Sequence, residues 1–107
     1  QDYEIWIRWR VPDNFNAWAT NPITFQSRRT EITGSFVTTT LFDTTGAQEV
    51  ETKSTGAANT WTDTNLEATF AGTYTAGSYM TFRIGMRAIT NATVLAGEIT
   101  INYLSSN

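Results

Sequence analysis

The chain has 107 residues, of which 40% are hydrophobic and 13% aromatic, and its formal net charge is −3. This length and composition predict one globular domain covering residues 1–107, and exclude a disordered segment. Because the chain has neither cysteine nor histidine, it cannot form a disulfide, a thiolate nucleophile or a histidine-dependent triad. Its acidic balance and its lack of a long apolar run predict no nucleic-acid binding and no membrane insertion.

The first predicted strand is Tyr3–Val11, in which the side chains alternate between two faces. The apolar residues of one face are expected to point inward, and the opposite face holds the charges. These faces are Tyr3, Ile5, Ile7, Trp9 and Val11 on one side, and Glu4, Trp6, Arg8 and Arg10 on the other. The turn residues Pro12-Asp13-Asn14 end the strand. Phe15–Asn21, which contains Trp18, is a predicted loop.

Three further strands are predicted in the middle of the chain, at Ile23–Arg29, Phe36–Asp43 and Glu49–Lys53, the last of them a short edge strand. The β-branched residues of Phe36–Asp43 favour a strand, although its sequence leaves open which face is buried. Leu66–Gly72 alternates apolar and polar residues as a strand does.

The clearest strand pattern lies at the C-terminal end, in Tyr79–Ala88 and Gly97–Leu104. Both segments have one apolar face, and the polar residues Thr90–Thr93 between them predict a hairpin loop. The long first and last strands are expected to be neighbours in one sheet. No segment has a useful helical period.

Seven to eight short strands separated by turn residues predict an all-β fold, an antiparallel β-sandwich of jelly-roll type. The largely buried core is expected to hold the inward-facing side chains of these strands. They are Ile5, Ile7, Trp9, Phe25, Phe82, Ile84, Ile99, Ile101 and Tyr103.

The C-terminal third also carries a motif, T-A-G-x-Y-h-T-h-R-h followed by h-x-G-E-I-x-h-N-Y, where h is apolar. Its residues here are Thr75, Ala76, Gly77, Tyr79, Thr81, Arg83, Gly97, Glu98, Ile99, Asn102 and Tyr103. This motif resembles a jelly-roll-like domain of bacteriophage virion proteins, such as head and tail fibres and their receptor-facing tips. The resemblance implies a virion or extracellular location, other virion proteins as partners, and three-fold assembly.

The residues supply no evidence for catalysis. The acidic residues are scattered, and no phosphate-binding loop or dinucleotide motif is present. We therefore expect no enzyme activity and no cofactor. Two loops, around Asp13 and around Asp63, offer oxygen ligands that could bind Ca²⁺, but local turn formation is the favoured role of such residues.

The candidate binding or interface surface consists of tryptophan and arginine residues. They are Trp6, Arg8, Arg10, Trp18, Trp61, Arg83 and Arg87. Trp and Arg are enriched in interface centres, which predicts a homo-oligomer, a trimer by the resemblance. Capping of the core is the favoured role of Trp18 and Trp61, and stacking on a ligand is the alternative. A competing interpretation of the charged face is a monomer whose arginines lie over the aromatic rings and pair with Glu4 and Glu98.

Three classes of function follow. The first is a non-catalytic phage virion domain for assembly, with possible recognition of a host-surface glycan. The second is a carbohydrate-binding module of a secreted protein, which a row of coplanar exposed aromatic rings would favour. The third, a small enzyme, would need two facing carboxylates in a cleft.

Overall fold

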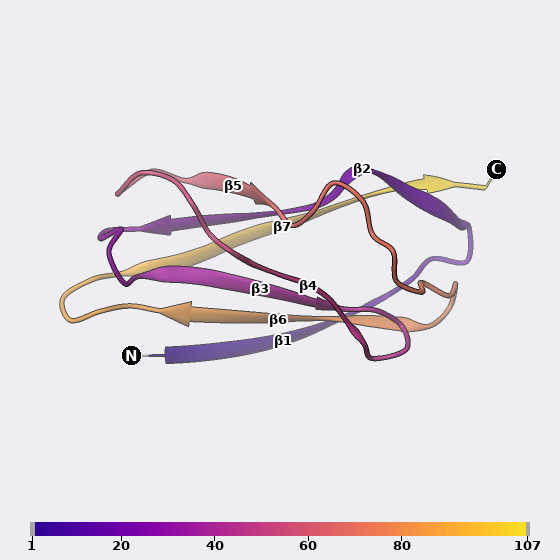
Figure 1. Ribbon diagram of the computed structural model, residues 1–107, viewed down its shortest axis with the longest axis horizontal. Helices are drawn as coiled ribbons and strands as arrows, with labels where there is room; N and C mark the ends of the chain where they lie inside the picture. Colours follow the sequence, from indigo (N-terminus) through magenta and orange to yellow (C-terminus); the bar gives the residue numbers. More distant parts are fainter. Residues whose placement is uncertain (1, 107) are drawn as a thin grey trace.

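The computed structural model describes residues 2–106, which form seven β-strands and no helix (Figure 1). The strands are β1 (Asp2–Arg10), β2 (Phe15–Arg29), β3 (Phe36–Phe42), β4 (Gln48–Lys53), β5 (Thr62–Asn65), β6 (Tyr79–Arg87) and β7 (Val94–Ser105). They make two antiparallel sheets: a four-stranded sheet of order β1-β6-β3-β4 and a three-stranded sheet of order β5-β2-β7. The predicted all-β, two-sheet architecture is confirmed. None of the described chain could cross a membrane as a helix, because no helix of the required length and apolarity is present.

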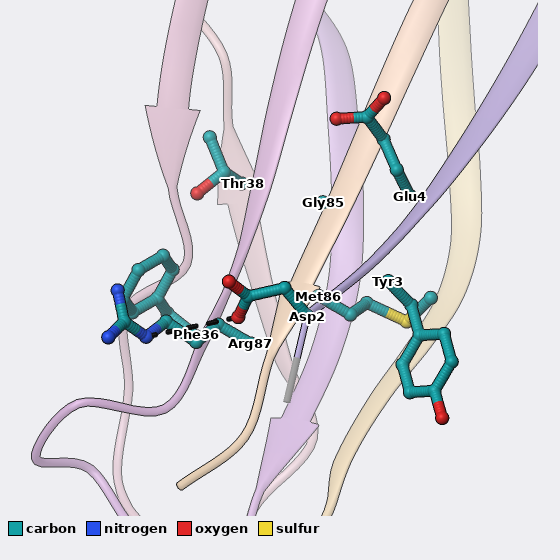
Figure 2. Close-up of a pocket in the computed structure, with 8 residues that line it drawn as sticks. All are labelled: Asp2, Tyr3, Glu4, Phe36, Thr38, Gly85, Met86 and Arg87. Atoms are coloured by element: carbon teal, nitrogen blue, oxygen red, sulfur yellow. Dashed lines mark ion pairs between the residues drawn. The ribbon is translucent and has the colours of Figure 1, made fainter.

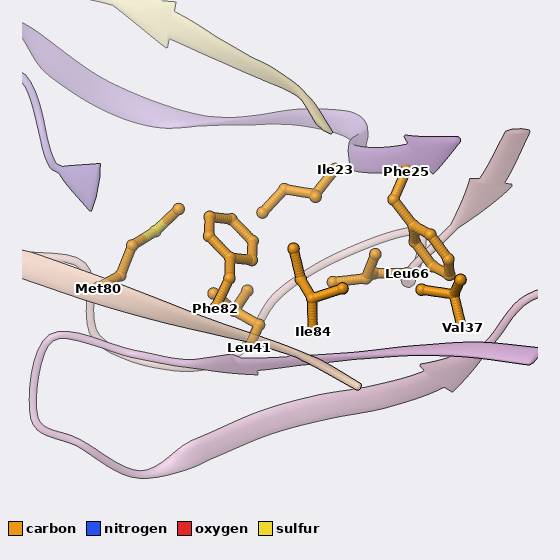
Figure 3. Packing of buried hydrophobic residues seen from close by; sticks show 8 residues of the cluster. All are labelled: Ile23, Phe25, Val37, Leu41, Leu66, Met80, Phe82 and Ile84. Carbon is orange, nitrogen blue, oxygen red and sulfur yellow. The ribbon is translucent and has the colours of Figure 1, made fainter. Parts of the chain in front are cut away.

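The core lies between the two sheets, where side chains from β2 meet side chains from β3 and β6 (Figure 3). Its buried residues are Ile23, Phe25, Val37, Leu41, Leu66, Met80, Phe82 and Ile84. Phe25, Phe82 and Ile84 were predicted to be buried, and the structure confirms these three. In β3 the side chains of Val37 and Leu41 point inward, which resolves the ambiguity that the sequence left.

The predicted burial of Ile5 and Ile7 is wrong, since their side chains are 45% and 40% exposed. Trp9 is half-buried, as are Ile99, Ile101 and Tyr103 at the other sheet's border. The physical reason is position: β1 and β7 each pair with one strand only, β6 and β2 respectively. Their apolar faces therefore lie at an open side of the sandwich.

The predicted pairing of the first and last strands is also wrong, because β1 and β7 belong to different sheets. For the same reason Thr90–Thr93 does not close a hairpin. It lies in the connection that carries the chain from β6 across to β7 (Figure 1), where the Ala92 N–H donates to the Ile89 carbonyl and Asn91 has a φ of 66°.

Two further boundaries differ from the prediction. Phe15–Asn21 is strand, not loop, because β2 starts at Phe15 and pairs with β7 over most of its length, with register shifts that include one between Trp18 and Ile23. Within that shift Asn21 adopts a φ of 52°, which locally disrupts the ladder as a bulge does. Leu66–Gly72 is not a strand.

Candidate functional site

The outer face of the four-stranded sheet holds a cluster of aromatic and arginine side chains from β1, β3 and β6. The ring of Trp6 stacks on that of Phe42, with centroids 5.9 Å apart and planes inclined by 20°. The guanidinium of Arg83 lies 5.6 Å from the Trp6 centroid and 5.5 Å from the Phe42 centroid. Arg8 lies over the ring of Tyr79 at 4.1 Å. We call these five residues the aromatic–arginine cluster.

Arg83 is held in the cluster by polar contacts along one row of the sheet. In the strand register Arg83 lies opposite Thr40 of β3, and Thr40 lies opposite Glu51 of β4. The Arg83 guanidinium lies 3.2 Å from the Glu51 carboxylate and 3.4 Å from the Thr40 hydroxyl, and Thr40 donates to Glu51 at 3.0 Å. These contacts fix the arginine, while Trp6 beside it remains 55% exposed.

Next to the cluster, Gly85 leaves a hollow of about 450 Å³ in the same face. Figure 2 shows Gly85 between Thr38 and Glu4, its neighbours across the sheet, and the ion pair between Asp2 and Arg87 at 3.9 Å. A side chain longer than that of glycine would fill the space. Both signs of charge surround the hollow, so it has no clear preference for an anion or a cation.

The structure gathers five of the seven candidate residues on this face. Trp6, Arg8, Arg10, Arg83 and Arg87 all lie on β1 or β6. The competing interpretation is supported in part, because arginines do lie over aromatic rings.

The partners of these arginines differ from those expected. Arg83 pairs with Glu51 in place of Glu4 or Glu98, and Arg10 pairs with Asp13 at 2.9 Å. Asp13, which belongs to one of the two loops considered for Ca²⁺, is therefore already paired with an arginine. The other segment was expected to be a loop, but Asp63 and Asn65 lie in strand β5, where the Asn65 side chain accepts a hydrogen bond from Thr24. Within residues 2–106, no three acidic side chains gather in a way that could hold a metal ion.

Trp18 lies elsewhere, in an aromatic group at the end of the sandwich. Its ring centroid is 5.0 Å from those of Phe15 and Tyr74, 5.3 Å from that of Phe70 and 6.3 Å from that of Trp9. The ring is half-buried and packs against the core. The structure therefore places it where the predicted capping role requires.

Trp61 lies just before β5 and is 50% exposed, so the expected capping role is wrong for this residue. Its ring covers the backbone of Gly97 on β7, where an added Cβ would meet Trp61 Cζ3 at 3.0 Å. The sequence spacing could not show this contact, because it depends on β5 and β7 lying on either side of β2.

A buried polar site that the sequence analysis missed is centred on Asp43, directly after β3. One of its carboxylate oxygens accepts hydrogen bonds from the Thr45 N–H, the Thr45 hydroxyl and the Ala47 N–H, and the other accepts from the Thr73 N–H. Burial alone would raise the pKa of Asp43, but these hydrogen bonds outweigh burial and lower it. Asp43 was predicted as the last residue of a strand, and its contact with Thr73 was not predicted.

Glu49 of β4 binds the same long loop between β5 and β6. Its carboxylate accepts hydrogen bonds from the N–H groups of Ala71 and Gly72 and from the Tyr74 hydroxyl at 2.8 Å. Burial, this hydrogen bond and the neighbouring negative charges raise the pKa of Tyr74 far above its usual range. We call Asp43 and Glu49 the carboxylate anchor. Its hydrogen bonds fix the turn after β3 and hold β4 against the loop before β6, which indicates a structural role.

No protein-family model matches the chain, and it has no significant match among curated proteins or solved structures. Its function must therefore be inferred from its surfaces and from the motif of its C-terminal third.

Proposed function

We propose that the chain is a non-catalytic structural domain of a bacteriophage virion, of head-fibre, tail-fibre or decoration type, which acts in assembly. The C-terminal motif supports this proposal, since it resembles jelly-roll-like domains of such proteins. The two-sheet fold is compatible with a jelly-roll type, which we retain as part of the proposal. A location on the virion, outside the cell after release, follows from it.

The observation that carries the proposal is the aromatic–arginine cluster. An exposed Trp stacked on Phe, with an arginine fixed beside both rings, has the composition of an interface centre more than of ordinary solvated surface. Arg83 has already lost side-chain freedom to its contacts with Glu51 and Thr40. A partner that covers it therefore has less conformational entropy to overcome.

The resemblance further implies a trimer, and the cluster is the surface that we assign to contact with other copies or other virion proteins. Recognition of a host-surface glycan is a secondary role, in which several linked weak sites would gain affinity together.

A carbohydrate-binding module is the alternative function. Its best support is the exposure of Trp6 and Trp61, because aromatic rings stack on sugars. These two rings, however, lie over different sheets, so they do not make one continuous platform. We therefore place this function second.

Immunogold labelling tests the proposal directly. Antibodies against the purified domain should label intact phage particles released by the organism that encodes the chain, and the label should be lost after competition with free domain. Unlabelled particles, together with abundant domain free in the medium, would overturn the virion assignment. A glycan array then separates the two roles: binding that Trp6→Ala and Trp61→Ala both abolish would favour the carbohydrate-binding alternative.

A further inference from the structure

The two sheets have four edge strands, and β1 differs from the other three. Strand β5 has four residues, β4 has six and meets β3 through a bulge, and β7 meets β2 with three shifts of register. By contrast, all nine residues of β1 pair with β6 in one unbroken register. Natural edges are commonly protected by short length, a proline, a bulge, an inward charge or charged side chains along the strand. Of these devices β1 has only the last, four charged side chains on its outer face.

The inner face of β1 is also uncovered. Tyr3 is 60% exposed, and Ile5 and Ile7 are nearly half exposed. Beside them an open groove of about 480 Å³ runs between the two sheets at the border of β1 and β7. Its lining is apolar: Ile7, Trp9, Phe82, Ile84, Gly97, Ile99 and Ile101. Something apolar that continued the sheet would fit this site.

The charges of β1 identify the occupant. On its outer face the acidic residues Asp2 and Glu4 precede Trp6, and the basic residues Arg8 and Arg10 follow it. A second β1 laid antiparallel, with Trp6 opposite Trp6, brings Glu4 opposite Arg8 and Asp2 opposite Arg10, each twice. A parallel arrangement would place like charges opposite each other, which is destabilising.

We propose that β1 pairs antiparallel with β1 of a second copy of this chain in that register. The pairing is isologous, as expected for a two-fold dimer. It joins both four-stranded sheets into one continuous sheet. On the inner face it sets Ile5 opposite Ile7, and Tyr3 opposite Trp9, so apolar meets apolar along the whole strand. Because the two-fold axis is normal to the joined sheet, both inner faces lie on the same side and each copy covers the groove of the other.

The charges remain available for this pairing. Glu4 accepts a hydrogen bond from the Trp6 indole N–H at 2.9 Å and Arg8 lies over the Tyr79 ring, but both side chains are exposed and neither forms an ion pair within residues 2–106. The contacts of Asp2 with Arg87 and of Arg10 with Asp13 also join exposed side chains. Such exposed pairs are individually weak. The inference does not depend on the virion assignment, because a virion domain and a sugar-binding module could both use this edge. It does replace the trimer that the resemblance implies with a two-fold dimer.

Two double variants with identical composition and net charge test the register. Glu4→Arg with Arg8→Glu exchanges the two signs and preserves opposite-charge pairing at every position. Glu4→Arg with Arg10→Glu places arginine opposite arginine and acid opposite acid. Multi-angle light scattering should give a dimer for the wild type and the first variant. The dissociation constant of the second variant's dimer should be about tenfold higher than that of the wild type, or more.

Ile5→Lys provides a second route that is independent of the outer charges. Because the Ile5 side chain is nearly half exposed in one copy, the variant should still fold, which circular dichroism can verify. The lysine should prevent the inner faces of two copies from packing together, so the variant should be a monomer. Glu98→Arg on the β7 edge is the matched control and should leave the dimer intact. A wild type that is monomeric up to millimolar concentration, a trimer, or two double variants that behave alike would each overturn the proposal.

Discussion

The carboxylate anchor allows the effect of one substitution to be worked out from the contacts. In Asp43→Asn, the amide oxygen can keep the three hydrogen bonds that one carboxylate oxygen accepts from Thr45 and Ala47. The amide nitrogen then replaces the oxygen that accepts from Thr73, so two N–H groups face each other at that site. Loss of one hydrogen bond to a charged group costs about 1.5–3 kcal/mol. With a urea m-value of about 2 kcal/mol/M for a small protein, the midpoint of unfolding should fall by about 1 M.

The same substitution should remove a pH dependence. An unfolded aspartate has a pKa of about 3.9, and the hydrogen bonds lower the pKa of Asp43 in the folded state. Its contribution to stability is therefore fully present above the unfolded pKa, and is lost as the pH falls through the lower, folded pKa. Urea unfolding followed by tryptophan fluorescence should show the gap between wild type and variant shrinking as the pH falls from neutral toward 2. Asp63→Asn, at an exposed carboxylate of β5, is the control. Equal midpoints at neutral pH, or a gap that does not change with pH, would refute the reasoning.

Three further outcomes can be checked by the same unfolding assay. Phe82→Ala removes a side chain that is 1% exposed and should cost about 3–5 kcal/mol, whereas Ile5→Ala at the open edge should cost less than about 1 kcal/mol at a protein concentration at which the chain is monomeric. Similar losses at both sites would contradict the open-edge assignment. Gly72→Ala would place a Cβ 2.6 and 2.8 Å from oxygens of the carboxylate anchor and should cost about 1–3 kcal/mol, so an unchanged midpoint would show that the loop is not held as described. Gly85→Ala is its matched control, because the nearest atom is 3.9 Å away and the free energy of unfolding should change by about 0.5 kcal/mol or less.

The alternation of side chains predicted where most strands lie, but not what covers them. Ile5 and Ile7 of β1 have the same two-residue period as Phe82 and Ile84 of β6. Strand β6 lies between β1 and β3, under the facing sheet, while β1 is an edge. The period shows which residues share a face. Burial depends on strand order, which is set by pairings between distant segments.

The candidate surface shows the same division between local and distant information. Alternation within β1 and within β6 correctly placed Trp6 and Arg83 on outer faces, and the register sets them directly opposite each other. Phe42 and Glu51, which complete the surroundings of Arg83, could not be predicted. They reach it only because β3 and β4 follow β6 in the sheet.

Solubility alone would explain the presence of charges on β1, but not their order. Two acids at the ends of the strand with two arginines between them would hydrate the edge equally well and would resist pairing in either direction. In the actual order both acids lie before Trp6 and both arginines after it, which opposes a parallel second copy and favours an antiparallel one. The inner face is apolar along the same strand, so a copy that satisfies the outer charges also covers the exposed isoleucines. A monomeric edge would require neither property, and their coincidence on the one long, regular edge is the strongest physical reason to regard β1 as a contact between copies.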